Sequence, residues 1–220
     1  MAKRLFDFSF ALMCLFLSLP VWAFICLAIW FQDGIPIFYF QKRVGKNGKI
    51  FKIMKFRSML KDAEKDIGAI WAEEKDQRIT RIGKILRDTA MDELPQLLSI
   101  LKGDMSFVGP RPERPELVAE FIKNFSAFNL RHAVIPGLTG VAQILGSAYL
   151  DYHKKSQYDM WYIKNQNFLL DIYLIFLSFM ITFQRKWGIK EEKFIYLLRD
   201  FKKRVEKEIS QSSNFKNLIT

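Results

Sequence analysis

The chain has 220 residues, enough for one domain with a sizeable core. Its 34 Lys and Arg outnumber its 23 Asp and Glu, and the net charge of +11 suits nucleic acid, anionic lipid or phosphorylated substrates. Half of the residues are hydrophobic and 21 are Phe, which disfavours a soluble nucleic-acid binder and favours membrane contact. The two cysteines, Cys14 and Cys26, lie in one apolar segment and are expected to be reduced packing residues, which excludes a disulfide framework.

The first predicted element is an apolar helix over residues 8–31, which contains no charged residue. Its length of about 36 Å would span a hydrocarbon core of about 30 Å, and a signal peptide is excluded because the run is too long and no cleavage site follows. Pro20 is expected to break the helix at its middle, and Ser18 could satisfy freed backbone groups. The flanks are basic on both sides (Lys3, Arg4, Lys42 and Arg43), which favours a cytoplasmic location for both ends. From composition alone, a re-entrant hairpin and a kinked spanning helix are both open.

Two short strands are expected at residues 35–40 and 50–56, because Asn47-Gly48 between them is a strong hairpin signal. The charged residues 59–76 are expected to form a helix. Basic and aliphatic residues alternate over 76–87, which predicts a helix or loop along an anionic surface.

The adjacent carboxylates Asp92 and Glu93 are the most informative feature of the chain. They lie just before or within the first turn of a helix predicted from Pro95 to Gly103. The positive end of a helix dipole stabilises an anion there, whether carboxylate or phosphate. Several arginines lie nearby in the sequence (Arg78, Arg81, Arg87 and Arg111). Anions among cations, in a chain with a membrane segment, indicate phosphate chemistry at a bilayer, although an acid pair on a solvated helix end is the simpler alternative.

The C-terminal half is expected to contain turn-rich loops at 110–112 and 136–140, followed by two helices. The helix over 168–183 is predicted to lie on the surface or in the core, because it is slightly short to span a membrane. Apolar residues recur at helical spacing over 194–205, which predicts an amphipathic helix that docks against lipid or a partner. Residues after Ser210 are predicted to be disordered.

Familiar catalytic motifs are missing from the sequence. It contains no G-x-x-x-x-G-K-[ST] or G-x-G-x-x-G phosphate loop, no H-E-x-x-H, no Asp-x-Asp and no cysteine-based metal spacing. The two histidines, His132 and His153, give little support to histidine-based acid–base catalysis. The carboxylate pair therefore remains the best catalytic candidate.

Several short runs occur in an order that is typical of one family. They are Lys3-Arg4-Leu5-Phe6-Asp7, Gln41-Lys42-Arg43-Val44-Gly45, Lys55-Phe56-Arg57-Ser58-Met59, Asp92-Glu93-Leu94-Pro95-Gln96-Leu97, Gly103-Asp104-Met105-Ser106, Val108-Gly109-Pro110-Arg111-Pro112-Glu113, Pro136-Gly137-Leu138-Thr139-Gly140 and Tyr158-Asp159. Over residues 3–188 the chain thus resembles the bacterial sugar transferase family, in the short form of its monotopic phosphoglycosyl transferases.

The resemblance implies a reaction in two steps. Asp92 would attack the β-phosphate of a UDP-sugar, release UMP and carry the sugar phosphate covalently until undecaprenyl phosphate accepts it. Glu93, with Asp92, would hold Mg²⁺, which prefers hard oxygen ligands and screens a negative nucleophile from a diphosphate. The residues expected to contact phosphate or substrate are Lys55, Arg57, Arg87, Arg111 and, as a weaker candidate, Asp159.

The resemblance also implies a mostly helical α+β fold in three parts. Residues 1–34 would form a re-entrant membrane helix-break-helix that bends at Ser18 and Pro20. Residues 35–188 would form a cytoplasmic catalytic domain with surface-lying amphipathic helices and a small β-hairpin, and residues 189–220 a C-terminal amphipathic helix and tail. The enzyme would contact lipid at the cytoplasmic face of the bacterial inner membrane and bind no nucleic acid, and a homodimer is left open.

The sequence departs from the family pattern at two places. Leu19 separates Ser18 from Pro20, where the family commonly has Ser-Pro, so backbone satisfaction at the bend differs. Residues 143–147 replace a basic triplet that members often carry, which bears on sugar selectivity.

Two other functions fit the residues without the resemblance. One is a membrane-anchored glycosyl transferase that moves the sugar alone and releases UDP. The other is a non-enzymatic basic membrane scaffold whose C-terminal helix binds a partner and which turns over no nucleotide.

Overall fold

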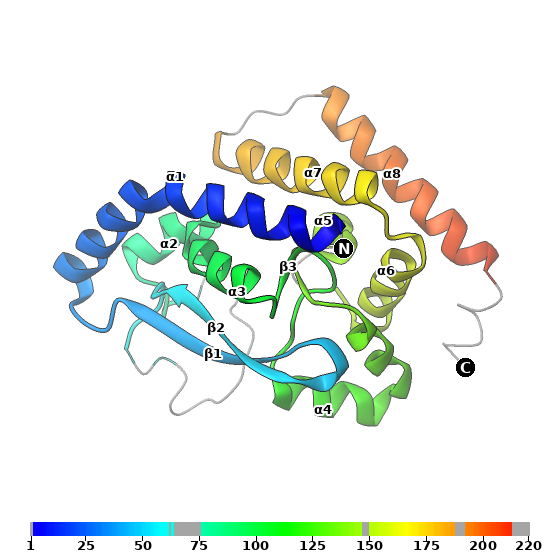
Figure 1. Ribbon diagram of the computed structural model, residues 1–220, viewed down its shortest axis with the longest axis horizontal. Helices are drawn as coiled ribbons and strands as arrows, with labels where there is room; N and C mark the ends of the chain where they lie inside the picture. Colours follow the sequence, from blue (N-terminus) through cyan, green and yellow to red (C-terminus); the bar gives the residue numbers. More distant parts are fainter. Residues whose placement is uncertain (1, 62, 64–75, 147–149, 188–191, 213–220) are drawn as a thin grey trace.

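The computed structural model describes residues 2–61, 63, 76–146, 150–187 and 192–212, and this part of the chain is mostly helical with a small β-hairpin, as predicted, and a second two-stranded sheet that was not predicted (Figure 1). Most of the predicted helix over 59–76 and the tail from residue 213 lie outside the described residues. The elements in chain order are α1 (Ala2–Asp33), β1 (Phe38–Val44), η1 (Lys46–Gly48), β2 (Ile50–Phe56), α2 (Arg81–Asp88), η2 (Met91–Gln96), α3 (Leu97–Lys102), β3 (Ser106–Val108), α4 (Pro115–Asn124), η3 (Ser126–Ala133), β4 (Gly137–Thr139), α5 (Val141–Leu145), α6 (Tyr152–Asn165), α7 (Phe168–Trp187) and α8 (Glu192–Gln211), where η marks a 3₁₀ helix.

The predicted β-hairpin is confirmed. Strands β1 and β2 pair antiparallel, and the turn places Asn47 (φ 55°) and Gly48 (φ 76°) in the left-handed region that these residue types tolerate. The first strand begins at Phe38 and continues to Val44, so the predicted range 35–40 is too early. The polar residues 41–43 pair with 51–53 because a strand ladder joins backbone groups, whatever the side chains are.

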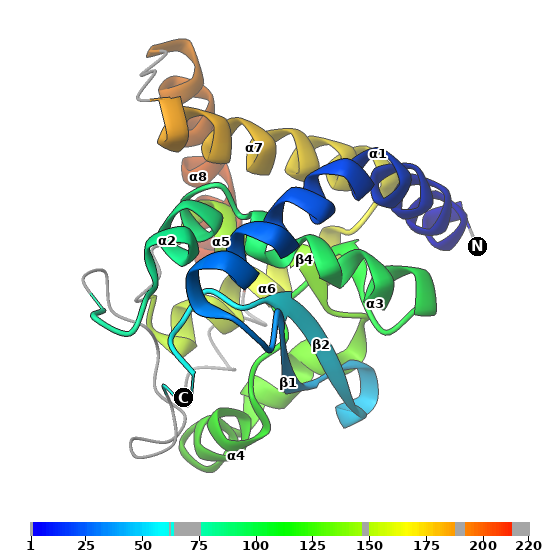
Figure 2. The ribbon, with the colours of Figure 1, turned by 90° about the vertical axis from the view of Figure 1, so that its left-hand side faces the viewer.

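Helix α1 is continuous from Ala2 to Asp33, so the predicted break at Pro20 is not an interruption of the helix. In Figure 2 the ribbon of α1 changes direction between its two halves, as expected for a proline inside a helix. The Ser18 hydroxyl donates to the carbonyl of Leu15 at 3.0 Å, not to that of Phe16, which Pro20 deprives of its donor. By length and composition, α1 is the one helix in the described part of the chain that could cross a membrane.

The first two turns of α1 are bound to the rest of the domain. Lys3 Nζ forms an ion pair with Asp171 of α7 at 2.5 Å, and the buried carboxylate of Asp7 accepts the backbone N–H of Phe107 at 3.2 Å. The Arg4 guanidinium donates to the carbonyls of Ile100 (2.5 Å) and Leu101 (2.7 Å), which belong to the last turn of α3. Lys3 and Arg4 therefore bind protein groups and attach the first turn of α1 to α3 and α7.

The second half of α1 packs against the same domain. Ile25 and Ile29 form a buried cluster with Phe56 of β2 and Leu86 of α2. Trp22 meets the Phe56 ring edge-on at 5.2 Å. Most apolar side chains on the opposite side of α1 are exposed (Phe8, Leu12, Phe16, Leu17, Leu19, Phe24, Leu27 and Phe31).

The main core is formed largely by buried apolar residues of α3, β3, α5, α6, α7 and α8. Strands β3 and β4 pair in parallel there, with Ser106 opposite Gly137 and Val108 opposite Thr139. A Cβ on Gly137 would lie 2.0 Å from the backbone nitrogen of Gly109, so glycine is required for this approach.

The two predicted C-terminal helices are both present. Helix α7 buries Leu174 and Leu177 but exposes Phe176 and Phe179, so it combines a core face with an apolar surface face. In α8 the predicted amphipathic pattern is confirmed, and its buried residues pack on α6 and α7 through Phe201, which meets Trp161 and Tyr173 edge-on. Its apolar face is thus covered by this chain itself, which the sequence pattern did not foresee.

Candidate active site

The acid pair lies in η2, between α2 and α3, as the predicted helix start requires. Ala90 precedes it in the left-handed region (φ 55°), which is uncommon for a residue with a Cβ, and the Glu93 N–H donates to the Ala90 carbonyl at 3.2 Å. Met91 and Leu94 pack against the cluster formed by the second half of α1, β2 and α2. Both carboxylates are therefore fixed beside α1.

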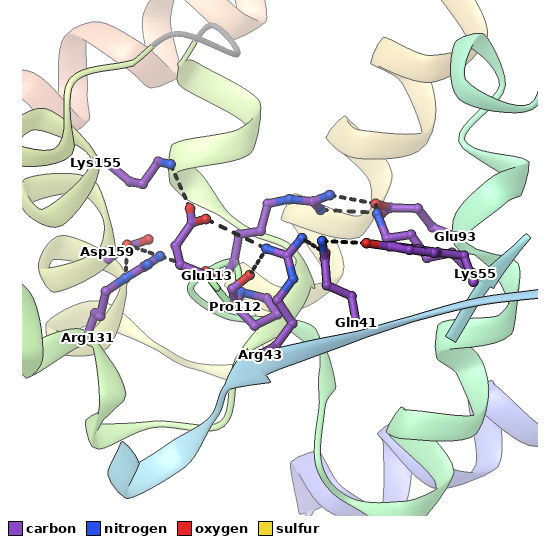
Figure 3. A network of polar contacts seen from close by, with 11 residues as sticks. Gln41, Arg43, Lys55, Glu93, Pro112, Glu113, Arg131, Lys155 and Asp159 are labelled. Carbon is purple, nitrogen blue, oxygen red and sulfur yellow. Dashed lines mark hydrogen bonds and ion pairs between the residues drawn. The ribbon is translucent and has the colours of Figure 1, made fainter. Parts of the chain in front are cut away.

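Glu93 is held by two cations (Figure 3). Lys55 Nζ on β2 lies 2.6 Å from Oε1, and Arg111 donates to Oε1 at 2.5 Å and to Oε2 at 3.3 Å. Burial opposes ionisation of Glu93, but Arg111 and Lys55 outweigh it and hold the pKa of this carboxyl below its usual range. Glu93 is thus a fixed anion that aligns Lys55 and Arg111.

Asp92 has different surroundings. Its residue is 6% exposed, and within the described part of the chain its carboxylate accepts no hydrogen bond and joins no ion pair. Burial raises the pKa of Asp92 to about 6, while Lys55 and Arg87 lower it and Glu93 raises it. A carboxylate that is unpaired, more basic than usual and still mostly ionised at neutral pH is suited to nucleophilic attack.

Arg111 approaches Glu93 from a loop whose other residues are also held by polar contacts (Figure 3). Arg43 on β1 donates to the Pro112 carbonyl at 2.8 Å and lies 3.7 Å from the Glu113 carboxylate. Lys155 on α6 donates to the other Glu113 oxygen at 2.8 Å. These contacts tie the proline-bounded loop to β1 and α6.

Asp159 does not reach the acid pair. Its carboxylate is buried and pairs with Arg131 of η3, at 2.9 Å from Nε and 2.7 Å from Nη2, and Arg131 in turn donates to the backbone carbonyl of Arg111 at 2.8 Å. Burial raises the pKa of Asp159, and Arg131 beside it opposes that shift. The expected substrate contact is therefore an internal ion pair behind Arg111.

Arg57 and Arg87, two further predicted phosphate ligands, lie on the α1 side of the acid pair. Arg57 follows β2, is 6% exposed and donates to the carbonyls of Asp33 (2.8 Å) and Gly34 (3.0 Å), so it ties down the end of α1. Arg87, in the last turn of α2, donates from Nε to the Ser58 hydroxyl at 3.1 Å and acts electrostatically on Asp92. Arg87 is the better placed of the two for an anion beside Asp92.

The profile of the bacterial sugar transferase family matches residues 1–185. The chain belongs to the bacterial sugar transferase family. Similar proteins include an UDP-N-acetylgalactosamine-undecaprenyl-phosphate N-acetylgalactosaminephosphotransferase of Aeromonas hydrophila, 38% identical over 79% of this chain and 42% of the relative. The UDP-glucose:undecaprenyl-phosphate glucose-1-phosphate transferase of Klebsiella pneumoniae is 38% identical over 84% of this chain and 40% of its own length. The exopolysaccharide production protein ExoY of Rhizobium meliloti is 36% identical over 80% of this chain and 83% of that protein.

The chain thus spans less than half of the Aeromonas and Klebsiella relatives but most of ExoY. The match ends before α8, so this helix lies outside the region that carries the sugar transferase likeness.

The structure brings the predicted residues Lys55 and Arg111 to Glu93, beside Asp92, and shows two further cations near this site that the sequence did not indicate. Arg43 was interpreted as a flank of the membrane segment, although its side chain points into the Pro112–Glu113 loop (Figure 3). Arg131 gave no local signal, because its partner Asp159 is 28 residues away. The motif Val108–Glu113 offered a hint, since Glu113 is an acid in a basic surrounding and requires a cation when buried.

Proposed function

We propose that this sugar transferase is a phosphoglycosyl transferase that moves a sugar 1-phosphate from a UDP-sugar to undecaprenyl phosphate through a covalent intermediate on Asp92. The observation that carries the proposal is the contrast within the acid pair: Asp92 is buried and unpaired among the described residues, beside Glu93 locked to two cations. The names of the Aeromonas and Klebsiella relatives support the same donor and acceptor classes.

In the first step an Asp92 carboxylate oxygen attacks the β-phosphorus of the UDP-sugar. The bond from this phosphorus to the bridging oxygen breaks, and UMP leaves with that oxygen. In the second step an oxygen of undecaprenyl phosphate attacks the same phosphorus, the bond to Asp92 breaks, and the carboxylate is regenerated. The covalent intermediate replaces one direct displacement, in which undecaprenyl phosphate would attack the UDP-sugar, by two displacements with lower barriers.

Lys55, Arg87 and Arg111 supply the positive charge that such an exchange requires. Each of them acts electrostatically on Asp92, so each is close enough to act on phosphate oxygens at the attacked phosphorus. The Arg111 side chain is 35% exposed, which leaves its guanidinium accessible to a substrate as well as to Glu93.

The acid pair also fits a Mg²⁺ ion that is bound together with a diphosphate. Mg²⁺ is usually held by one or two carboxylates plus substrate phosphates and water. The Asp92 carboxylate is unpaired in the described structure, and Glu93 Oε2 receives a single contact of 3.3 Å. No group of three or more His, Cys, Asp or Glu suited to a metal occurs among the described residues, so Asp92 and Glu93 would hold the ion with substrate oxygens. A bound Mg²⁺ would neutralise charge on the diphosphate.

We also propose a monotopic, re-entrant arrangement at the cytoplasmic face of the inner membrane, and the two attachments of α1 support the monotopic part of it. Both its first turn and its last residues bind the same domain, through Lys3 and Asp171 at one end and Arg57 and Asp33 at the other. A helix that crossed a bilayer of about 30 Å would place these ends on opposite sides.

The proposal is tested by the nucleotide that is released and by trapping the intermediate. Detergent-solubilised enzyme incubated with a panel of UDP-sugars and undecaprenyl phosphate should release UMP, and a donor labelled at the β-phosphate should label the wild-type chain. Asp92→Asn should abolish the label and lower turnover about 10⁴-fold or more. Release of UDP would indicate transfer of the sugar alone, and full activity of Asp92→Asn would contradict the covalent step.

A further inference from the structure

The loop that carries Arg111 is fixed at four consecutive backbone carbonyls. The Gly137 N–H donates to the Pro110 carbonyl at 2.9 Å, Arg131 Nη2 to the Arg111 carbonyl at 2.8 Å, Arg43 Nη1 to the Pro112 carbonyl at 2.8 Å, and the Val44 N–H to the Glu113 carbonyl at 2.9 Å. The two β1 contacts hold the far end of the loop. Arg131 donates to the backbone of Arg111 itself, and the Arg111 guanidinium in turn binds the Glu93 carboxylate.

Arg131 is oriented by Asp159. Nε and Nη2 both bind Asp159 Oδ2, at 2.9 Å and 2.7 Å, and the guanidinium lies 4.7 Å from the centre of the Phe128 ring. The two charged side chains are 1% and 2% exposed, so neither can contact a substrate without rearrangement (Figure 3). Contacts therefore run from α6 through Asp159 and Arg131 to the Arg111 backbone, and from the Arg111 side chain to Glu93.

Stability alone is a weak reason for a buried ion pair, because the cost of removing two charges from water offsets most of their attraction. This pair instead provides geometry. Nη2 lies close to both Asp159 and the Arg111 carbonyl, and a planar guanidinium bound at Nε and Nη2 has little freedom to rotate.

We propose that Arg131 and Asp159 are positioning residues that set the place of the Arg111 guanidinium against the acid pair and the substrate phosphates. The inference rests on the proposed sugar-phosphate transfer. Neither residue touches the reacting atoms, and both act through Arg111. Loss of the pair lets the Arg111 carbonyl move, and a misplacement of about 1 Å at a catalytic group can lower a rate about 100-fold.

The first measurement is steady-state transfer by Asp159→Asn and Arg131→Lys. Asp159→Asn keeps the side-chain volume and one acceptor oxygen but removes the charge that orients Arg131. Arg131→Lys keeps the charge but cannot hold Asp159 and the Arg111 carbonyl in one planar fork. Both variants should lower kcat by about 10- to 100-fold, with the KM for the UDP-sugar changed far less than kcat.

The decisive measurement is a double-mutant cycle with Arg111→Lys. If the pair acts through Arg111, then adding Asp159→Asn to Arg111→Lys should lower kcat by no more than about twofold. The full loss of 10- to 100-fold in both backgrounds would overturn the proposal. Arg131→Lys gives a second, independent cycle with a balanced buried charge, so the test does not depend on the folding of Asp159→Asn.

Tyr158→Phe is the matched control. Tyr158 precedes Asp159 on α6, is 1% exposed and donates a hydrogen bond to Glu206 of α8 at 2.9 Å, away from the Arg111 loop. Loss of this hydrogen bond should lower the melting temperature and leave kcat within about twofold of the wild-type value. A drop in kcat as large as that of Asp159→Asn would mean that loosening α6 suffices, which contradicts the proposal. Wild-type enzyme that releases no UMP would instead refute the proposed function and leave the cycle without a signal, so the two failures are distinct.

Discussion

At the scale of single residues, Asp92 and Glu93 are neighbours in sequence with different partners in space. Glu93 balances Lys55 and Arg111, whereas Asp92 is buried without a partner in the described structure. Two adjacent carboxylates with equal surroundings would compete for the same cations and proton. The fold removes this competition by pairing both close cations with Glu93, which leaves the Asp92 carboxylate without an ion pair among the described residues, as the proposed covalent step requires.

Glu93→Gln tests the role of that balance. The substitution leaves Lys55 and Arg111 without their anion, so we expect a loss of about 2 kcal/mol in the free energy of unfolding and a fall in kcat of about 100-fold or more. Urea unfolding in detergent and UMP release measure the two effects. Glu120→Gln on the exposed side of α4 is the control and should change neither. Unchanged turnover in Glu93→Gln would show that the fixed anion is dispensable.

His132 predicts a pH dependence of stability. It is buried, its Nδ1 lies 3.0 Å from the Asn129 side-chain oxygen, and burial, together with the neighbouring Arg131, lowers its pKa to about 4. The unfolded chain, with a histidine pKa of about 6.5, binds this proton first. The stability that neutral His132 contributes is therefore complete above pH 6.5 and is lost as the pH falls towards 4.

His132→Gln should therefore flatten the curve of unfolding free energy against pH between about 6.5 and 4 relative to wild type. Chemical unfolding at a series of pH values measures it. A variant curve parallel to that of wild type over this interval would contradict the assignment.

At the scale of elements, η2 is constrained by the left-handed Ala90 that precedes it. A non-glycine residue in this region costs about 1–2 kcal/mol, part of which a glycine regains after its own entropic cost. Ala90→Gly should therefore raise the free energy of unfolding by about 0.5–1 kcal/mol. Ala142→Gly in α5 is the control and should lower it by about 1 kcal/mol. Thermal unfolding measures both changes. Equal destabilisation by Ala90→Gly and Ala142→Gly would show that the left-handed backbone of Ala90 is not strained.

The elements also show what local sequence can predict. Asn47-Gly48 specified the hairpin turn and Gly103 the end of the short helix α3, because Asn and Gly tolerate the left-handed backbone angles that both places require. Pro95 did not mark the helix start, because it lies inside η2 together with the acid pair. The local sequence did not predict the contacts of Arg43, Arg131 and Asp159, because their partners are distant in the sequence. A charged residue looks the same in sequence whether it faces solvent or a buried acid, so internal ion pairs required the structure.

The same reasoning applies to α1. Pro20 predicted a change of direction, which the ribbon shows, but the helix remains continuous because a proline removes one hydrogen bond and the others hold the turns together. The contacts of Lys3 with Asp171 and of Arg4 with the end of α3 were not predicted either, because their partners are distant in the sequence.

At the scale of the whole molecule, α1 both contacts the catalytic elements and exposes an apolar side. Ile25 and Ile29 pack beside Phe56 and Leu86, while Phe16, Leu17 and Phe24 are exposed. The same helix therefore packs beside the acid pair on one side and offers an apolar surface suited to lipid on the other. In the proposed reaction a polyprenyl phosphate keeps its chain in the bilayer while its phosphate reaches Asp92, so the site must lie close to the membrane surface.

Cysteine labelling tests the topology that follows. After replacement of Cys14 and Cys26, single cysteines are placed at Ala2, at Lys46 in η1 and at Leu17, all of which are exposed in the structure. A membrane-impermeant maleimide should modify Ala2→Cys and Lys46→Cys only from the cytoplasmic side, because both ends of α1 are bound to one domain. Leu17→Cys, on the lipid-facing side, should react from neither side until detergent is added. Labelling of Ala2→Cys from the periplasmic side would require the contacts of Lys3 with Asp171 and of Arg4 with α3 to be broken, and would replace the re-entrant arrangement by a spanning helix.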